Sequence, residues 1–561
     1  MPVGTIVTGT MKLRRIRGRT TSFVALLAAL SGALLVQSAA MADDMPDYVA
    51  SGPTASRPAA PFGYSMSAPE AVLASPTPDY FKAVYPHLLR APLPVRIYNQ
   101  GGVPPLLPRL ALTGNPYGRL GTFLPGGPIV PARHAFFRAL GTNGRACVTC
   151  HQPPSGMSFS LRNVNARFRN TQGTDPIFAP VDGANCPDAV PAASTSAAPY
   201  GGARGKGKTT LRAAYSLLLG RGLIRVAMPW PPRDNPDPEF TLELLRDAPR
   251  CNASSGFGLP TGLASVYRRP MMSAQLNFKT VRPDGTGPIL AGSLMWDGRE
   301  TSLEQQAIDA TLGHAQATHP PSQVEVRQIV DFQNAIFSAQ LKDRSAGLLD
   351  AAGGRGGPVW LSRQPVNPSF VPPVTPFDEF AAWASQAGTR KAIQNGQQIF
   401  NRRPLLISGV AGLNDVVANP FVGSCATCHN IDHAGADLFA HPQRDLGIGG
   451  TASGAGGPPP AGDLPVFRLT CRADAAPHPF RGRGPIDTND PGLALLTGKC
   501  ADIGRFTVPQ LRALAAREPF FHDGSARTLA DVVRFYEHRF RFDPPLDDRE
   551  RSDLVAFLSA L

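Results

Sequence analysis

The sequence predicts a mainly α-helical protein of two similar domains, the first of which carries a long loop-rich insertion. The pattern Cys-x-x-Cys-His occurs at Cys147–His151 and again at Cys425–His429, and residues with helical spacing precede each copy. Between the two copies, residues 160–285 contain no long periodic segment, which is typical of loops. A repeated plan of helix, motif and loop therefore favours two helical domains.

The N-terminus has the pattern of an export signal. A basic segment precedes the apolar run Phe23–Val36, and Ala40-Met41-Ala42 supplies the small residues of a cleavage site. We therefore expect residues 1–42 to be a signal peptide and the mature chain to be periplasmic, a retained membrane anchor being the alternative. Residues 43–75, rich in Ala, Pro and Ser, are expected to be a disordered tail.

The composition narrows the class of partner. The formal net charge is +13 at pH 7, but no run of Lys or Arg marks a nucleic-acid-binding patch. We interpret the excess as surface charge, which would help an acidic redox partner to dock. No stretch after the signal is long and apolar enough to span a bilayer, so stable membrane insertion is not expected.

The first domain is predicted over 76–350. A helix is expected at Pro131–Gly141, where proline stands at the start and glycine at the end, and it leads into the first motif. A longer helix is expected over Gln323–Leu341, because apolar residues recur at three-to-four spacing. The Gly- and Pro-rich segment 351–376 is the predicted linker.

The second domain, 377–561, repeats this plan. A helix around Thr389–Phe400 has Gly396 on its apolar face, where glycine would permit close helix crossing. The closing helix, Asp547–Leu561, begins with acidic residues, which the positive N-terminal end of a helix favours. Its apolar positions are Leu554, Phe557, Leu558 and Leu561.

The repeated motif predicts two covalently bound haem c groups. Two thiols three positions apart add to the vinyl groups of one haem, and the adjacent histidine binds the iron. A zinc knuckle or a Cys-x-x-Cys redox pair is the alternative, and it leaves the adjacent histidines unexplained. The residues expected to hold the haems are Cys147, Cys150 and His151 in the first motif, and Cys425, Cys428 and His429 in the second.

The other four of the eight cysteines fall as one pair in each half of the chain. In an oxidising compartment they would form disulfides, and four cysteines allow three pairings. We predict the pairing within each half, Cys186–Cys251 and Cys471–Cys500.

Four short blocks bear on function: Trp296–Arg299, Ser302–Ala307, Phe506–Arg512 and Pro519–Ser525. Together with the two motifs, they resemble the signature of bacterial di-haem cytochrome c peroxidases and their MauG relatives. The resemblance leaves out residues 43–120 and the insertion. It implies reduction of hydrogen peroxide at the first haem with electrons relayed from the second, and an electron-donor cytochrome or a protein substrate as partner. It also implies a calcium ion between the domains, although no side-chain cluster for calcium stands out in the sequence.

The resemblance assigns roles around the first haem by position. Trp296 matches the tryptophan that relays electrons between the haems, with a buried core tryptophan as the alternative, and Gln306 matches a distal-pocket glutamine. Ten residues later the family has a glutamate that acts as acid and base, whereas this chain has Gln316, whose amide cannot shuttle a proton. His314, two residues earlier, would supply the base or bind the iron directly.

The sixth ligand of the second haem also departs from the peroxidases. All ten methionines lie at or before Met295, so none follows the second motif. The family's methionine position corresponds to Tyr536, and MauG-like enzymes use a tyrosine there, whose phenolate stabilises ferric iron. His538 and His478 are the alternatives. The substitutions at 316 and 536 predict weak steady-state peroxidase activity.

Two other functions stay open from the sequence. The chain could be a di-haem electron-transfer cytochrome without peroxidase turnover. It could also be a di-haem oxygenase acting on an organic substrate, for which the insertion 160–285 would build the pocket.

Overall fold

Helices and strands both contribute to the fold, and the prediction of a mainly α-helical protein is wrong. Of the residues that the structure describes, about 33% are helical and 19% lie in strands. The strands are short, from the two residues of β7 (Gly347–Leu348) to the eight of β4 (Phe240–Asp247). Most lie in Gly- and Pro-rich segments, where a short strand leaves little periodic signal.

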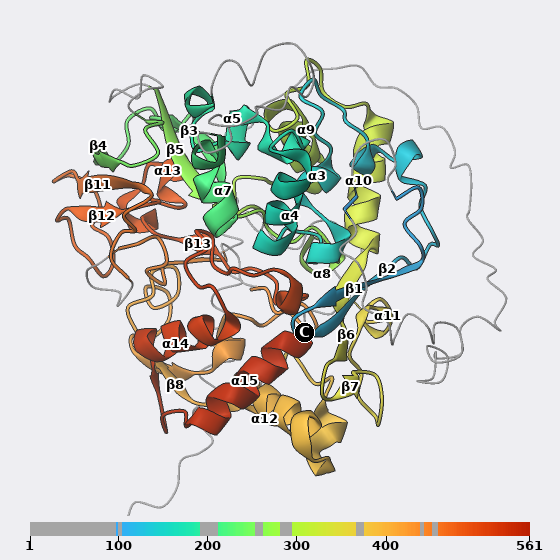
Figure 1. The fold of residues 1–561 in the computed structure, drawn as a ribbon. Coiled ribbons are helices and arrows are strands. Elements are labelled where there is room, and N and C mark those ends of the chain that lie inside the picture. Colours follow the sequence, from blue (N-terminus) through green and yellow to red (C-terminus); the bar gives the residue numbers. More distant parts are fainter. Residues whose placement is uncertain are drawn as a thin grey trace, which may run out of the picture. The chain divides into compact units, whose positions relative to one another are not determined.

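The computed structural model describes residues 97–98, 104–190, 211–252, 262–280, 294–365, 375–437, 442–451 and 458–561. All of them belong to one compact unit, residues 76–561 (Figure 1). The predicted signal peptide and tail, residues 1–42 and 43–75, lie outside the described residues. Within the described part of the chain, no helix has the length and apolar character needed to cross a bilayer.

The α-helices of the described residues are α3 (Cys147–Cys150), α4 (Leu161–Thr171), α5 (Pro180–Gly183), α7 (Ser216–Arg221), α8 (Asn277–Thr280), α9 (Leu303–Gly313), α10 (Gln323–Ala335), α11 (Pro358–Leu361), α12 (Gly388–Arg402), α13 (Ala494–Thr497), α14 (Leu529–Arg539) and α15 (Asp548–Ala560). The other strands are β1 (Leu110–Asn115), β2 (Gly118–Phe123), β3 (Ile224–Trp230), β5 (Gly262–Arg268), β6 (Phe337–Asp343), β8 (Leu405–Ile407), β9 (Phe421–Gly423), β10 (Gln443–Arg444), β11 (Pro465–Cys471), β12 (Ile486–Thr488), β13 (Phe506–Thr507) and β14 (Arg541–Phe542). The small sheets have the strand orders β1-β2-β6-β7, β12-β11-β4, β14-β8-β9, β10-β13 and β3-β5.

The predicted insertion is not simply loop. It contains α4 and the strands β3, β4 and β5. Strand β4 pairs antiparallel with β11, which lies more than 200 residues later, from Asp247 opposite Pro465 to Phe240 opposite Cys471 (Figure 1). Its residues alternate at first between buried and exposed, a weak strand signal that was present in the sequence. The insertion thus supplies an edge strand to a sheet completed by the second half of the chain.

The predicted helix at Pro131–Gly141 is wrong. The chain forms two short 3₁₀ turns, Pro131–Arg133 and Ala135–Phe137, and His134 between them is extended, with φ −118° and ψ 130°. The His134 ring accepts a hydrogen bond from the backbone N–H of Phe136, 3.2 Å away, and so competes with a continuous helix. The expected apolar positions Phe136 and Phe137 are buried nonetheless.

The predicted helix over Gln323–Leu341 is correct only in its first part. Helix α10 ends at Ala335, and the chain then continues as β6. Strand β6 pairs with β2, in a register that places Phe337 opposite Phe123. Tertiary pairing therefore determines where this helix ends.

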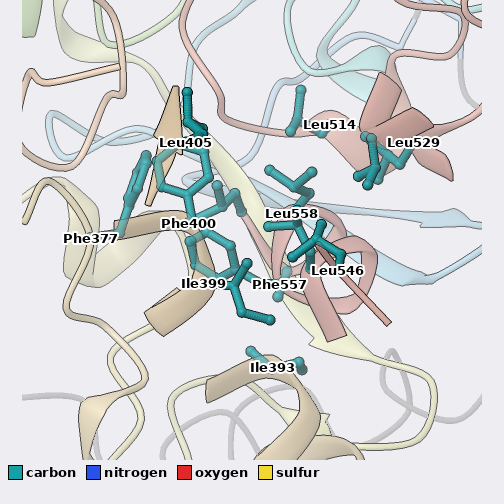
Figure 2. Close-up of a cluster of buried hydrophobic side chains, with 14 of the residues drawn as sticks. Phe377, Ile393, Ile399, Phe400, Leu405, Leu514, Leu529, Leu546, Phe557 and Leu558 are labelled. Atoms are coloured by element: carbon teal, nitrogen blue, oxygen red, sulfur yellow. The ribbon is translucent and has the colours of Figure 1, made fainter. Parts of the chain in front are cut away.

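The helices expected in the second half are confirmed as α12 and α15, which pack against each other (Figure 1). Helix α15 is capped by Asp547, whose carboxylate accepts a hydrogen bond of 2.7 Å from the N–H of Glu550. The predicted apolar face of α15 is buried in a core with Phe377 and Phe400 (Figure 2). Gly396 lies where the two helices meet, and a β-carbon there would clash with the carbonyl oxygen of Asp553 in α15.

Both predicted disulfides are confirmed. Cys186 pairs with Cys251 at a Cα–Cα distance of 5.0 Å, and Cys471 pairs with Cys500 at 6.0 Å. The cysteines of the two Cys-x-x-Cys-His motifs are free thiols. The domain boundaries at 76–350, 351–376 and 377–561 stay a prediction.

Candidate functional site

Both Cys-x-x-Cys-His motifs open onto one continuous cavity. Each motif forms a single turn: α3 in the first, and a 3₁₀ turn at Cys425–Thr427 in the second. The threonine inside each turn accepts a hydrogen bond of 3.0 Å from the backbone N–H just before the motif. The motif residues that line the cavity are Cys147, Cys150, His151, Cys425, Cys428 and His429.

The two histidines are held in the same way. Nδ1 of His151 lies 3.0 Å from the carbonyl oxygen of Met157, and Nδ1 of His429 lies 2.6 Å from that of Gly435, in each case six residues further along. A carbonyl only accepts, so Nδ1 donates and Nε2 keeps a free lone pair. Burial lowers the pKa of both rings, that of His429 to about 4, which favours the neutral form that binds metals.

The charges on the cavity wall are of one sign. Among the described residues, the lining includes no Asp or Glu, and its other members are mostly apolar. Haem is an apolar ring with two carboxylates, so two free thiols, a free imidazole nitrogen and basic groups in an apolar wall fit one haem at each motif. The basic residues of the lining are Arg138, Arg145, Arg268, Arg269, Lys279, Arg299, Arg444 and Arg517.

Three of the residues predicted around the first haem also line this cavity: Trp296, Gln306 and His314. Trp296 is buried, and its indole N–H donates a hydrogen bond of 2.7 Å to the carbonyl oxygen of Arg269. Its ring packs edge-to-face on that of His522, with the centroids 6.0 Å apart.

Gln316 is not brought into the site. Its backbone is in the left-handed region, with φ 55°, and its side chain is exposed. The side-chain oxygen accepts a hydrogen bond of 3.1 Å from Asn143 instead of facing the cavity. The position that the sequence aligned with the acid/base of the peroxidases therefore lies outside the cavity lining.

Comparison with known proteins finds peroxidase and MauG relatives. The chain is 28% identical over 286 residues to cytochrome-c peroxidase IdrP1 of Pseudomonas sp. (strain SCT), an alignment that covers 48% of this chain and 64% of the relative. It is 24% identical over 288 residues to the methylamine utilization protein MauG of Methylophilus methylotrophus, with the same coverage of each chain. By these alignments the chain is similar to cytochrome c peroxidases and to MauG. These relatives imply c-type haem as the cofactor.

Other comparisons add little. No family model matches the chain. A solved MauG-like protein associated with microbial copper homeostasis has a TM-score of 0.25 and 17% sequence identity to this chain. The alignment covers 52% of this chain and 80% of that chain, and the structural similarity is weak. The chain spans 64% of the length of the peroxidase and MauG relatives.

The residue predicted as sixth ligand of the second haem, Tyr536, lies in α14. Tyr536 lines the cavity, and burial raises its pKa above the ordinary value. His538 is exposed on the same helix, and His478 is buried elsewhere, 3.2 Å from the carbonyl oxygen of Ile503. Of these three candidates, only Tyr536 is among the described residues that line the cavity.

Two charged residues of the site escaped sequence reasoning. Arg145 lines the cavity beside the first motif, and Asp182 pairs with it from α5 in the predicted insertion. No motif or spacing marks Asp182, and the resemblance does not cover this stretch. Only the tertiary contacts of Asp182 in α5 with Arg145 and His314 reveal the pair.

Proposed function

We propose that the chain is a periplasmic di-haem c-type oxidoreductase, which reduces hydrogen peroxide at the first haem with electrons relayed from the second. The observation that carries this proposal is the single cavity onto which both motifs open, each with two free thiols and a histidine whose Nδ1 is held by a backbone carbonyl. The peroxidase and MauG relatives support peroxide as the oxidant and a protein as the electron donor. The predicted signal peptide supports the periplasm.

The chain's own residues would hold and orient the reacting groups. The four motif thiols would attach two haems, and His151 and His429 would bind the irons through Nε2 while Met157 and Gly435 fix their rings. Haem iron supplies the redox chemistry when bound. Each hydrogen peroxide takes up two electrons and two protons and leaves as two waters. A reduced cytochrome or another one-electron protein donor provides the electrons.

Trp296 is the proposed electron relay. It packs in one cluster with Phe506 and Ile448 from the second half of the chain, and with Met271 from the first half. Leu446 and Phe521 border both this cluster and the core beside Cys425 and Cys428. Dense packing from Trp296 to the second motif supports a relay role for the indole.

The proposed function is tested on exported protein. Mass spectrometry should show two haem masses, and steady-state assays with reduced cytochrome c should show peroxide turnover. A protein that carries fewer than two haems contradicts the proposal. Low-spin haems without peroxide turnover would identify an electron carrier, whereas oxygen uptake with a cleaved organic product would identify an oxygenase.

Tyr536→Phe is expected to change the optical and electron paramagnetic resonance signals of the second haem and to leave those of the first unchanged. The reason is that Tyr536, as proposed sixth ligand, would lose the oxygen that binds the iron. Tyr267→Phe is the matched control, since it removes another tyrosine hydroxyl, bonded to the carbonyl oxygen of Asn185, and should leave both spectra unchanged. An unchanged second-haem spectrum in Tyr536→Phe would contradict ligation by Tyr536.

A further inference from the structure

His314 is bound by a carboxylate that comes from the predicted insertion. Its Nδ1 lies 2.5 Å from Oδ2 of Asp182, whose side chain is 5% exposed. The other carboxylate oxygen of Asp182 accepts a hydrogen bond from the buried guanidinium of Arg145. Arg145 also donates to the carbonyl oxygens of Pro176 and Ile177, each 2.8 Å away, and these contacts tie the turn before α5 to the segment that precedes the first motif.

These contacts determine which ring nitrogen of His314 carries the hydrogen. Burial alone would raise the pKa of Asp182, but Arg145 and His314 lower it overall, so the carboxylate is ionised and can only accept. Nδ1 of His314 must therefore carry the hydrogen. His314 lines the cavity, and within the described part of the chain no hydrogen bond engages its Nε2. The Asp182–His314 pair thus leaves a free lone pair at the first motif.

We propose that Asp182 is a positioning residue that presents Nε2 of His314 to peroxide at the first haem, where His314 acts as the proton acceptor and donor. This inference rests on the proposed function, because it assigns the acid/base of the same site. It also fits the exposed position of Gln316, which leaves the acid/base role to another side chain. A histidine held by a carboxylate is suited to this role, because the carboxylate keeps one tautomer and stabilises the protonated ring.

The groups around His314 come from several elements. Asp182 approaches from α5 and Arg145 from the segment before α3, while His151 at the end of α3 and Glu300 before α9 also interact with it electrostatically. Arg145 balances the charge of Asp182, so the pair does not leave a lone buried anion beside the haem.

Nε2 of His314 takes the proton from one peroxide oxygen and returns it to the other, which leaves as water when the O–O bond breaks. Two electrons from the protein donor and two protons from solvent then reduce the remaining oxygen atom to a second water.

The test compares Asp182→Asn and His314→Ala with the unmodified haem-loaded protein. Cyanide is a second probe, because hydrogen cyanide must also give up a proton to a nearby base when it binds ferric haem. We expect His314→Ala to lower kcat for peroxide and the cyanide association rate by about 100-fold, the low end of general acid–base contributions. Asp182→Asn should lower both by roughly tenfold or more, the range for loss of a supporting partner, with little change in KM.

Asp175→Asn is the matched control. Asp175 is a carboxylate of the same region, 9% exposed, that pairs with Arg167, and Arg167 donates a hydrogen bond of 2.6 Å to the carbonyl oxygen of Thr149 in the first motif. This variant should lower thermal stability without slowing cyanide binding, since neither residue touches His314. Equal effects of Asp175→Asn and Asp182→Asn on cyanide association would overturn the proposal and leave Asp182 with a structural role only.

The remaining outcomes separate this inference from the proposed function. If His314→Ala converts the first haem from low spin to high spin and speeds up cyanide binding, His314 is an iron ligand and the inference is wrong. If the unmodified protein does not turn over peroxide but Asp182→Asn still slows cyanide binding, the proposed function fails and the positioning role stands. Brisk peroxide turnover with cyanide rates unaffected by Asp182→Asn overturns the inference alone.

Discussion

Replacement of His429 by alanine should reduce steady-state peroxide turnover by more than about 100-fold, beyond the loss typical of an outer-shell partner. The ring of His429 is fixed by Gly435 and faces the cavity, so its removal takes the proposed iron ligand from the second haem. The thioether bonds would keep that haem attached, and the first haem should keep its spectrum. Turnover assays and optical spectra of the reduced and oxidised protein measure the effect.

His151→Ala gives the complementary result, with the first haem disturbed and the second unchanged, because His151 is held in the same way by Met157. The exposed His319 offers a control, since His319→Ala removes a histidine outside the cavity lining and should change neither spectrum nor turnover. Full turnover in His429→Ala would show that the second motif has no part in the reaction.

Gly396→Ala should destabilise the protein by about 3 kcal/mol, at the upper end of the cost of overpacking a core. At Gly396 the backbone of α12 lies directly against that of α15, and an added methyl group would meet the carbonyl oxygen of Asp553 and the side chain of Phe557. The helices would have to separate, which would loosen the core around Phe400 and Phe557 (Figure 2). The midpoint of thermal unfolding measures this loss.

Gly220→Ala is the control for that substitution. Gly220 lies in α7, and a β-carbon there would meet no atom within 4 Å. Alanine is favoured over glycine inside a helix by about 1 kcal/mol, so this variant should unfold at the same temperature or slightly higher. An unchanged midpoint in Gly396→Ala would mean that α12 and α15 can move apart at little cost.

The insertion connects the fold to the proposed chemistry. It supplies β4 to a sheet shared with the second half of the chain, and it supplies Asp182, which pairs with His314 of the cavity lining. The disulfide from Cys186 to Cys251 links two distant segments within the insertion, and Cys186 lies only four residues after Asp182. A segment outside the family resemblance thus takes part in both the fold and the site.

The sequence by itself determined the features that lie within one or two helical turns. Both haem motifs are of this kind, because the thiols and the histidine belong to a single turn whose hydrogen bonds are local. The closing helix is another such feature, since its cap at Asp547 and its apolar face from Leu554 onward depend on residues that are close together in the sequence. The disulfide pairing was predicted but not determined by the sequence, because four cysteines allow three pairings, and the structure confirms the pairing within each half.

Only the tertiary structure decided features that depend on contacts between distant segments. The strands were missed because β4 and β6 are stabilised by partners far away in the chain, which local propensity does not report. The direction of the side chains at the first haem was missed for a related reason. The backbone at Gln316 turns its side chain towards Asn143, while α5 brings Asp182 to His314, and both arrangements arise from packing around the first motif.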